Sequence, residues 1–199
     1  MVTRELNTKR VLLHLLRNIS IPCTITLLAS QLGLSRVGIW KILKQFEDDK
    51  YITLTAVGAG KTSAFLVNLN WENQLVEKTL SLFLTEEAIK QRRWQVNFAD
   101  LEKVTDFVIL YGSILTSAQQ AHDIDILGIT PIKNFVKIQQ IIDSVQKTQP
   151  KKIHSLNFTQ IEFKTELKKQ NSALTDSIKK GVILFGQEKF VQFMKEIKK

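Results

Sequence analysis

The stretch Val108-Ile109-Leu110-Tyr111-Gly112-Ser113 is followed, after a nine-residue spacer, by Asp123-Ile124-Asp125-Ile126. The first segment has the pattern of a buried strand that runs into Gly-Ser, and the second that of a strand with two aspartates one residue apart. Side chains alternate between the faces of a strand, so Asp123 and Asp125 are predicted to share a face. Two neighbouring carboxylates repel each other unless a cation lies between them. Mg²⁺ is the usual solution because it prefers oxygen ligands and holds nucleotide phosphates.

Gly112 and Ser113 complete this pattern as candidate nucleotide-binding residues. Gly112 would let a phosphate approach the backbone. Ser113 would donate a hydrogen bond to it at the start of a helix predicted to reach about Gln119. The alternative for the two aspartates is a solvated strand edge or a helix cap.

Around this core the C-terminal half alternates between strands and helices. Strands are predicted at residues 107–111, 124–129, 152–158 and 182–185, and helices at 134–146, 160–169, 172–180 and 187–197. This order indicates an α/β (α+β) domain of residues 100–199, with a mixed sheet and flanking helices.

The strand, Gly-Ser, spacer and Asp-x-Asp order resembles the nucleotidyltransferase superfamily that shares its core with DNA polymerase β, and above all its minimal members. The resemblance implies that Asp123 and Asp125 are catalytic and hold Mg²⁺, and that Gly112 and Ser113 bind a nucleoside triphosphate. Minimal nucleotidyltransferases often modify a toxin partner, so a protein acceptor is one implied partner.

The chain departs from that family's pattern in its acids. Active members bring a third carboxylate from a later strand, but the predicted strand 152–158 has none. Glu162 is the nearest acid and falls in the next predicted helix. His154 either faces the site or packs against the core, and His122 is expected at the surface.

The N-terminal part has a different pattern. Helices are predicted at residues 5–17, 26–32 and 36–48, with Gly33 and Ser35 between the last two, and strands at 51–55 and 65–69. The segment from Ile25 to Arg36 resembles the helix-turn-helix of winged-helix regulators. The resemblance implies DNA binding, with protein contacts as the alternative use of this fold. The residues expected to contact DNA are Arg36, Val37, Trp40, Lys41, Lys44 and, at the tip of the wing, Lys61.

Composition and charge set the remaining expectations. The net charge is +9, with basic ends and an acidic middle, and Cys23 is the only cysteine, which excludes an internal disulfide and a cysteine-rich zinc site. No apolar run is long enough to span a membrane and residues 1–10 lack a signal pattern, so we expect a cytoplasmic protein without a membrane partner. Three regions result: a winged helix-turn-helix (1–70), a helical linker (71–99) that could support a homodimer, and the nucleotidyltransferase-like domain (100–199).

Two functions compete on this basis. One is an enzyme that binds DNA and transfers a nucleotidyl group, with Mg²⁺, from a nucleoside triphosphate to a protein, RNA or small-molecule hydroxyl. The other is a transcriptional regulator whose degenerate transferase domain senses a nucleotide or mediates assembly without catalysis.

Overall fold

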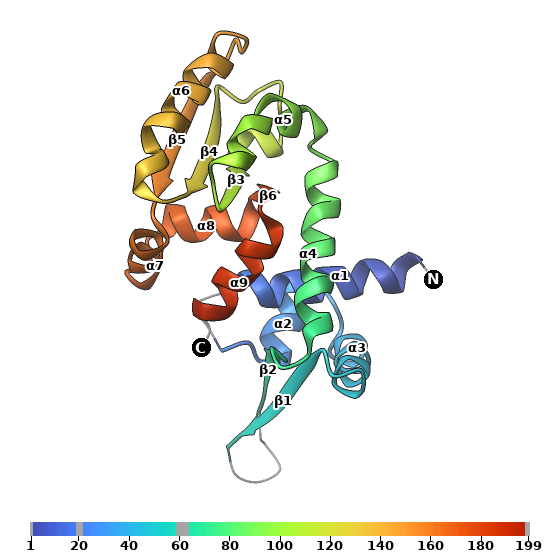
Figure 1. The fold of residues 1–199 in the computed structure, drawn as a ribbon. Helices are drawn as coiled ribbons and strands as arrows, with labels where there is room; N and C mark the ends of the chain where they lie inside the picture. Colours follow the sequence, from blue (N-terminus) through green and yellow to red (C-terminus); the bar gives the residue numbers. More distant parts are fainter. Residues whose placement is uncertain (1, 19–21, 59–63, 198–199) are drawn as a thin grey trace. The chain divides into compact units, whose positions relative to one another are not determined.

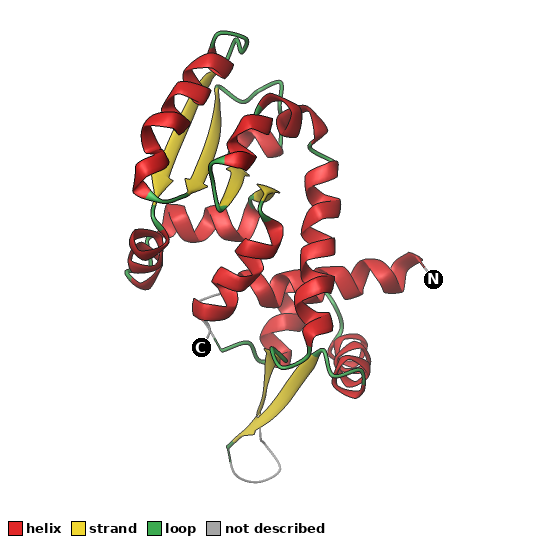
Figure 2. Ribbon diagram, in the orientation of Figure 1, coloured by secondary structure: helices red, strands yellow, loops and turns green. Residues whose placement is uncertain are grey.

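The computed structural model describes residues 2–18, 22–58 and 64–197, with side chains from residue 7 onward. The chain is a mixed α/β protein that divides into two compact units, residues 1–83 and 84–199 (Figures 1 and 2). The division falls inside helix α4 (Gln74–Ile89), within the segment expected to join two domains. None of the helices in the described ranges has the length and apolar character needed to cross a membrane.

Within the described residues, the N-terminal unit contains three helices, a hairpin and the first part of α4. The elements are α1 (Val2–Arg17), α2 (Ile25–Leu32), α3 (Arg36–Asp48), β1 (Ile52–Val57) and β2 (Ala64–Leu69). The two strands are antiparallel, with Ile52 opposite Leu69. Ile39, Leu43 and Phe46 are buried, which confirms the face of α3 predicted to point inward.

Local sequence explains where these helices begin and end. Gly33 ends α2 in the left-handed conformation (φ 64°), and Ser35 caps α3 by accepting a hydrogen bond from the Gly38 amide at 3.0 Å. Both features were predicted. Lys50, just after α3, is also left-handed (φ 59°), a conformation that costs a non-glycine residue about 1–2 kcal/mol.

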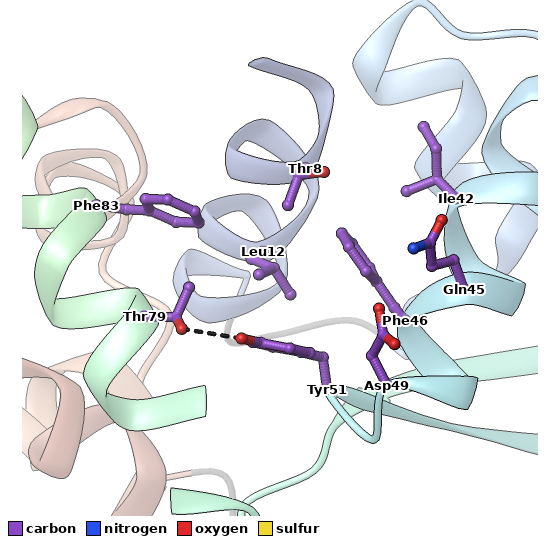
Figure 3. Close-up of a pocket in the computed structure, with 9 residues that line it drawn as sticks. All are labelled: Thr8, Leu12, Ile42, Gln45, Phe46, Asp49, Tyr51, Thr79 and Phe83. Atoms are coloured by element: carbon purple, nitrogen blue, oxygen red, sulfur yellow. Dashed lines mark hydrogen bonds between the residues drawn. The ribbon is translucent and has the colours of Figure 1, made fainter. Parts of the chain in front are cut away.

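A pocket of about 240 Å³ opens in this unit among α1, α3, the segment that leads into β1, and α4 (Figure 3). Its walls are mainly apolar, with Leu12, Phe46 and Phe83 among them. The Tyr51 hydroxyl lies 3.2 Å from the Thr79 hydroxyl at its side. From α3 the pocket is lined by Ile42, Gln45 and Phe46, of which Gln45 was expected on the outward face with the residues predicted to contact DNA.

The C-terminal unit is built on one mixed sheet in the order β5-β4-β3-β6. Strand β3 is antiparallel to both β4 and β6, whereas β4 and β5 are parallel. The strands are β3 (Phe107–Tyr111), β4 (Asp123–Ile129), β5 (Lys152–Phe158) and β6 (Val182–Phe185). The helices are α5 (Arg92–Asn97), α6 (Phe135–Gln146), α7 (Gln160–Lys168), α8 (Ser172–Lys180) and α9 (Gln187–Ile197), with short 3₁₀ turns η1 (Ala99–Lys103), η2 (Ser113–Leu115) and η3 (Ile132–Asn134).

Each face of this sheet has its own apolar core. On one face, Leu110, Ile124 and Ile126 pack in a cluster with Phe98 and with Ile138 of α6. On the other face, the Phe107 ring lies 5.4 Å, between centroids, from the rings of both Phe190 and Phe193 of α9. Alternation of side chains along β3 and β4 therefore separates two buried layers.

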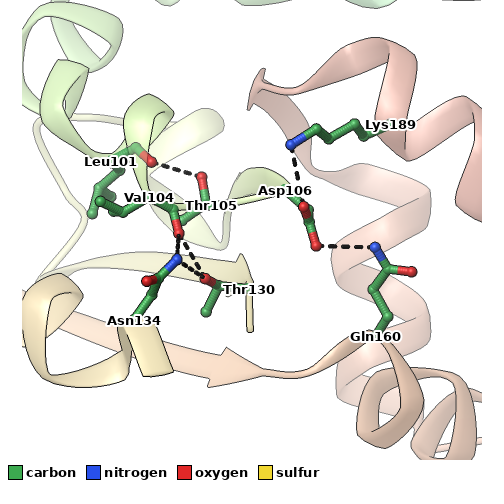
Figure 4. A network of polar contacts seen from close by, with 8 residues as sticks. All are labelled: Leu101, Val104, Thr105, Asp106, Thr130, Asn134, Gln160 and Lys189. Carbon is green, nitrogen blue, oxygen red and sulfur yellow. Dashed lines mark hydrogen bonds and ion pairs between the residues drawn. The ribbon is translucent and has the colours of Figure 1, made fainter. Parts of the chain in front are cut away.

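A polar network fixes the chain where it enters β3 (Figure 4). The Val104 carbonyl accepts hydrogen bonds from the Thr130 hydroxyl at 2.6 Å and the Asn134 amide at 2.8 Å. Asp106 accepts from Gln160 at 2.9 Å and pairs with Lys189 at 3.2 Å. Because these contacts hold the start of β3, they help to position the other end of the strand, where Tyr111 and Gly112 lie.

Candidate metal centre

Asp123 and Asp125 lie at the beginning of β4. Ile124 and Ile126, which alternate with them, are buried in the core of the opposite face. The two carboxylates therefore share one face of the sheet, where ligand atoms from both fall within a group spanning 4.8 Å. The prediction that both aspartates point the same way is confirmed.

His154 supplies a third side chain to this group. Strand β5 runs parallel to β4 with His154 opposite Asp125. The His154 Nδ1 lies 3.3 Å from Asp123 Oδ2 and 3.6 Å from Asp125 Oδ1. Of the two alternatives left open for His154, the structure selects the one in which it faces the carboxylates. The His154 Nδ1 and one oxygen from each aspartate could together bind a divalent metal ion.

The described residues bring no third carboxylate into this cluster. Glu162, the nearest acid in the sequence, caps helix α7 instead: its carboxylate accepts hydrogen bonds from the amide and hydroxyl of Thr159, both at 2.8 Å. These bonds, led by the one from the backbone amide, lower the pKa of Glu162. His122 is exposed and lies outside the cluster.

Gly112 follows the last residue of β3 and lies directly against Asp125. Its neighbour Tyr111 pairs with Asp125 across the sheet, and Gly112 itself has φ 82° and ψ −165°. A Cβ built on Gly112 would overlap Asp125 Oδ2 and lie 3.2 Å from its Cγ. Glycine is required here for two reasons, the backbone conformation and the approach of the carboxylate.

Ser113 begins only a short turn. The helix predicted to continue to about Gln119 is the single 3₁₀ turn η2, which ends at Leu115. The exposed Ser113 side chain is available to a ligand, but one turn offers little of the macrodipole expected from a helix. Any anion bound here would depend on side chains and individual amides.

The electrostatics of the site are those of a cluster with excess negative charge. Burial, followed by the charge of Asp123, raises the pKa of Asp125, while His154 opposes this shift. Burial and then the charges of Asp125 and Asp123 raise the pKa of Tyr111. A bound cation would relieve both effects.

A pocket of about 640 Å³ lies beside Gly112. Tyr111, Gly112, Leu115 and Thr116 form one side, and α8 forms the other with Ala173, Asp176, Ser177 and Lys180. Lys180 pairs with Asp176 at 2.6 Å. This volume is within the range of small-ligand sites. Sequence reasoning missed the α8 residues because only the packing of α8 on β3 brings them there.

The predicted DNA-contacting residues of α3 divide into two groups. Arg36, Val37, Lys41 and Lys44 are exposed. Trp40, expected on the open surface, is partly buried, with its ring centroid 5.7 Å from that of Phe65 on β2. Lys44 Nζ lies 5.0 Å from the Trp40 ring centroid and 2.7 Å from a Glu47 carboxylate oxygen. Lys61 lies outside the described residues.

Comparisons with known proteins identify no relative. Neither the models of protein families, nor the curated proteins, nor the solved structures include one that matches this chain. The geometry of the site is therefore the basis for any assignment.

Proposed function

We propose that the C-terminal unit binds a nucleoside triphosphate with a divalent metal ion and transfers a nucleotidyl group to a hydroxyl. The observation that carries this proposal is the group of Asp123, Asp125 and His154 beside Gly112 and the α8 pocket. The three side chains would hold the metal, which when bound supplies Lewis-acid stabilisation of phosphate charge. The acceptor hydroxyl would form a bond to the α-phosphorus, pyrophosphate would leave, and the hydroxyl proton would pass to water.

The protein's own groups would divide the remaining work. Gly112, having no side chain, lets the Asp125 carboxylate lie against the backbone at the end of β3. The α8 pocket would receive the base and sugar against the Tyr111 ring, and Lys180, at its edge, could exchange its pairing with Asp176 for a phosphate. Ser113 would donate its hydroxyl to a phosphate oxygen.

Calorimetric titration with ATP, CTP, GTP and UTP in the presence of Mg²⁺ or Mn²⁺ tests binding. The wild type is compared with the double variant Asp123→Asn/Asp125→Asn and with Asp143→Asn, an exposed aspartate on α6. Metal-dependent binding that only the double variant loses supports the proposal. Equal binding by all three proteins, or binding by none at millimolar nucleotide, refutes it. Transfer from α-labelled nucleotide to protein or RNA then measures catalysis.

The sensing function remains the second candidate, and one observation favours it: a histidine stands in the described cluster where a third acid would assist catalysis. A sensor would bind the nucleotide with metal in the titration and give no labelled product. The same pair of assays therefore separates the two functions.

For the N-terminal unit we propose DNA binding by a winged helix, supported by the helix order, the hairpin and the exposed Arg36 and Lys41 of α3. Fluorescence anisotropy with duplex DNA at several salt concentrations tests it. Arg36→Ala/Lys41→Ala should weaken binding and reduce the slope of log affinity against log salt by about 2 if both contact phosphates. Lys133→Ala, an exposed lysine of η3, is the control and should leave the slope unchanged.

A further inference from the structure

The donor set of the Asp123–Asp125–His154 cluster contains one feature that bears on the choice of metal. Two of its donors are carboxylate oxygens and the third is an imidazole nitrogen. Mg²⁺ binds oxygen almost exclusively and gains little from imidazole, whereas imidazole suits zinc, iron, nickel and copper, and raises affinity for first-row transition ions in general. We propose that this site selects a first-row transition dication, of the Mn²⁺ or Zn²⁺ kind, over Mg²⁺. The inference rests on the proposed function only in using the same three side chains.

The distances in the cluster suit such an ion. With metal–ligand bonds of about 2.1 Å and angles of about 90–109°, two donors of one ion lie about 3.0–3.4 Å apart. His154 Nδ1 is 3.3 Å from Asp123 Oδ2 and 3.6 Å from Asp125 Oδ1. The first distance falls in this range, the second lies just above it, and all three ligand atoms lie within 4.8 Å of one another, so the side chains would close in around a bound ion.

The sheet provides the placement of the imidazole. In-register parallel pairing sets His154 directly beside Asp125, and the ring turns Nδ1 toward both carboxylates. Asp123 pairs with Lys152 in the same register, so the next residue on this face of β5 is a cation and adds no further ligand. The site therefore offers three protein donors and, since His154 and Asp123 are 46% and 33% exposed, an open side for water or phosphate oxygens.

A second arrangement competes with this one. A protonated His154 could serve as the counter-ion of the two aspartates, so that no metal is needed. In that case His154→Ala would expose uncompensated carboxylates and would increase the affinity for any dication, Mg²⁺ included. The two arrangements thus predict opposite effects of the same substitution on Mn²⁺ and Zn²⁺ binding.

The test measures metal binding alone, without nucleotide, on the full chain free of a histidine tag. Isothermal titration gives Mg²⁺ and Zn²⁺ affinities, electron paramagnetic resonance gives Mn²⁺ affinity, and Co²⁺ absorbance reports nitrogen ligation. Variants are His154→Ala and His154→Asp, with His122→Ala as the matched control, and circular dichroism checks that each is folded. We expect the wild type to bind Mn²⁺ or Zn²⁺ at least tenfold more tightly than Mg²⁺. His154→Ala should lose at least tenfold of that affinity, His154→Asp should shift preference toward Mg²⁺, and His122→Ala should match the wild type.

Equal affinity of the wild type for Mg²⁺ and the transition ions, stronger binding by His154→Ala, or absence of metal binding would each overturn the inference. Its failure is distinguishable from failure of the proposed function. Nucleotide binding with Mg²⁺ that is unaffected by His154→Ala would refute the metal choice alone. A selective metal site in a chain that binds no nucleotide would refute the function alone.

Discussion

Replacement of Gly112 by alanine is the most direct structural perturbation of the site. The residue has φ 82° and ψ −165°, a region essentially restricted to glycine, which costs another residue about 1–3 kcal/mol. The added methyl group would also overlap Asp125 Oδ2, and turning that carboxylate away from its rotamer costs about 0.5–1.5 kcal/mol. We therefore expect Gly112→Ala to lower the free energy of unfolding by about 1.5–4.5 kcal/mol.

The same substitution should weaken the proposed metal binding, because it displaces the Asp125 carboxylate. The expected loss of Mn²⁺ affinity is roughly tenfold or more, as for other changes beside metal ligands. Gly33→Ala is the control: its φ is also positive (64°), but a Cβ there meets nothing within 4 Å. It should cost about 1–2 kcal/mol and leave metal affinity unchanged.

Urea unfolding followed by circular dichroism measures the first effect, and electron paramagnetic resonance of Mn²⁺ the second. If the free energy of unfolding of Gly112→Ala lies within about 0.5 kcal/mol of the wild-type value, the backbone conformation assigned to residue 112 is wrong. Unchanged Mn²⁺ affinity in a destabilised variant would instead show that Asp125 is not a ligand.

Three further substitutions test other parts of the C-terminal unit. Burial and the charge of Asp123 raise the pKa of Asp125, so ionisation of Asp125 destabilises the metal-free fold above that pKa. Asp125→Asn should therefore increase the free energy of unfolding at pH 8, by less than about 1 kcal/mol because water screens the two carboxylates. This gain should vanish as the pH falls below the normal aspartate range, and a gain that is absent at pH 8 would show that the carboxylates do not repel each other. Phe107→Ala should cost about 3–5 kcal/mol in urea unfolding, since its fully buried ring packs on Phe190 and Phe193, and a loss under 1 kcal/mol would contradict this packing. Thr130→Val should cost about 1 kcal/mol by the same measurement, because Val104 keeps its bond from Asn134; no loss at all would mean that the hydroxyl bond is not formed.

The sequence predicts the elements of this protein well because their signals are local. Gly33 and Ser35 mark a helix end and a helix start, and alternation along residues 123–126 is enough to place both aspartates on one face. The helix expected after Ser113 was wrong beyond Leu115, since the chain there turns back toward β4. Helical periodicity alone did not reveal that this segment is a short connection.

The parts of the site that the sequence left open or missed depend on pairing between distant segments. The sequence allowed two positions for His154, and the parallel pairing of β5 with β4, which sets it opposite Asp125, decides between them. A shift of one residue would turn it to the other face. The α8 side of the pocket requires the packing of α8 against β3, and the partial burial of Trp40 requires the approach of β2 to α3.

The order of the sheet makes β5 one of its two outer strands, with β6 the other, and this has a consequence for the proposed metal site. An outer strand presents one row of unpaired amides and carbonyls, which can recruit the same strand from another molecule. A metal held by His154 and the two aspartates would tie this strand to β4 from the side-chain face. If the site holds the proposed ion, we expect chelation to loosen this edge of the sheet, where pairing with another molecule can begin.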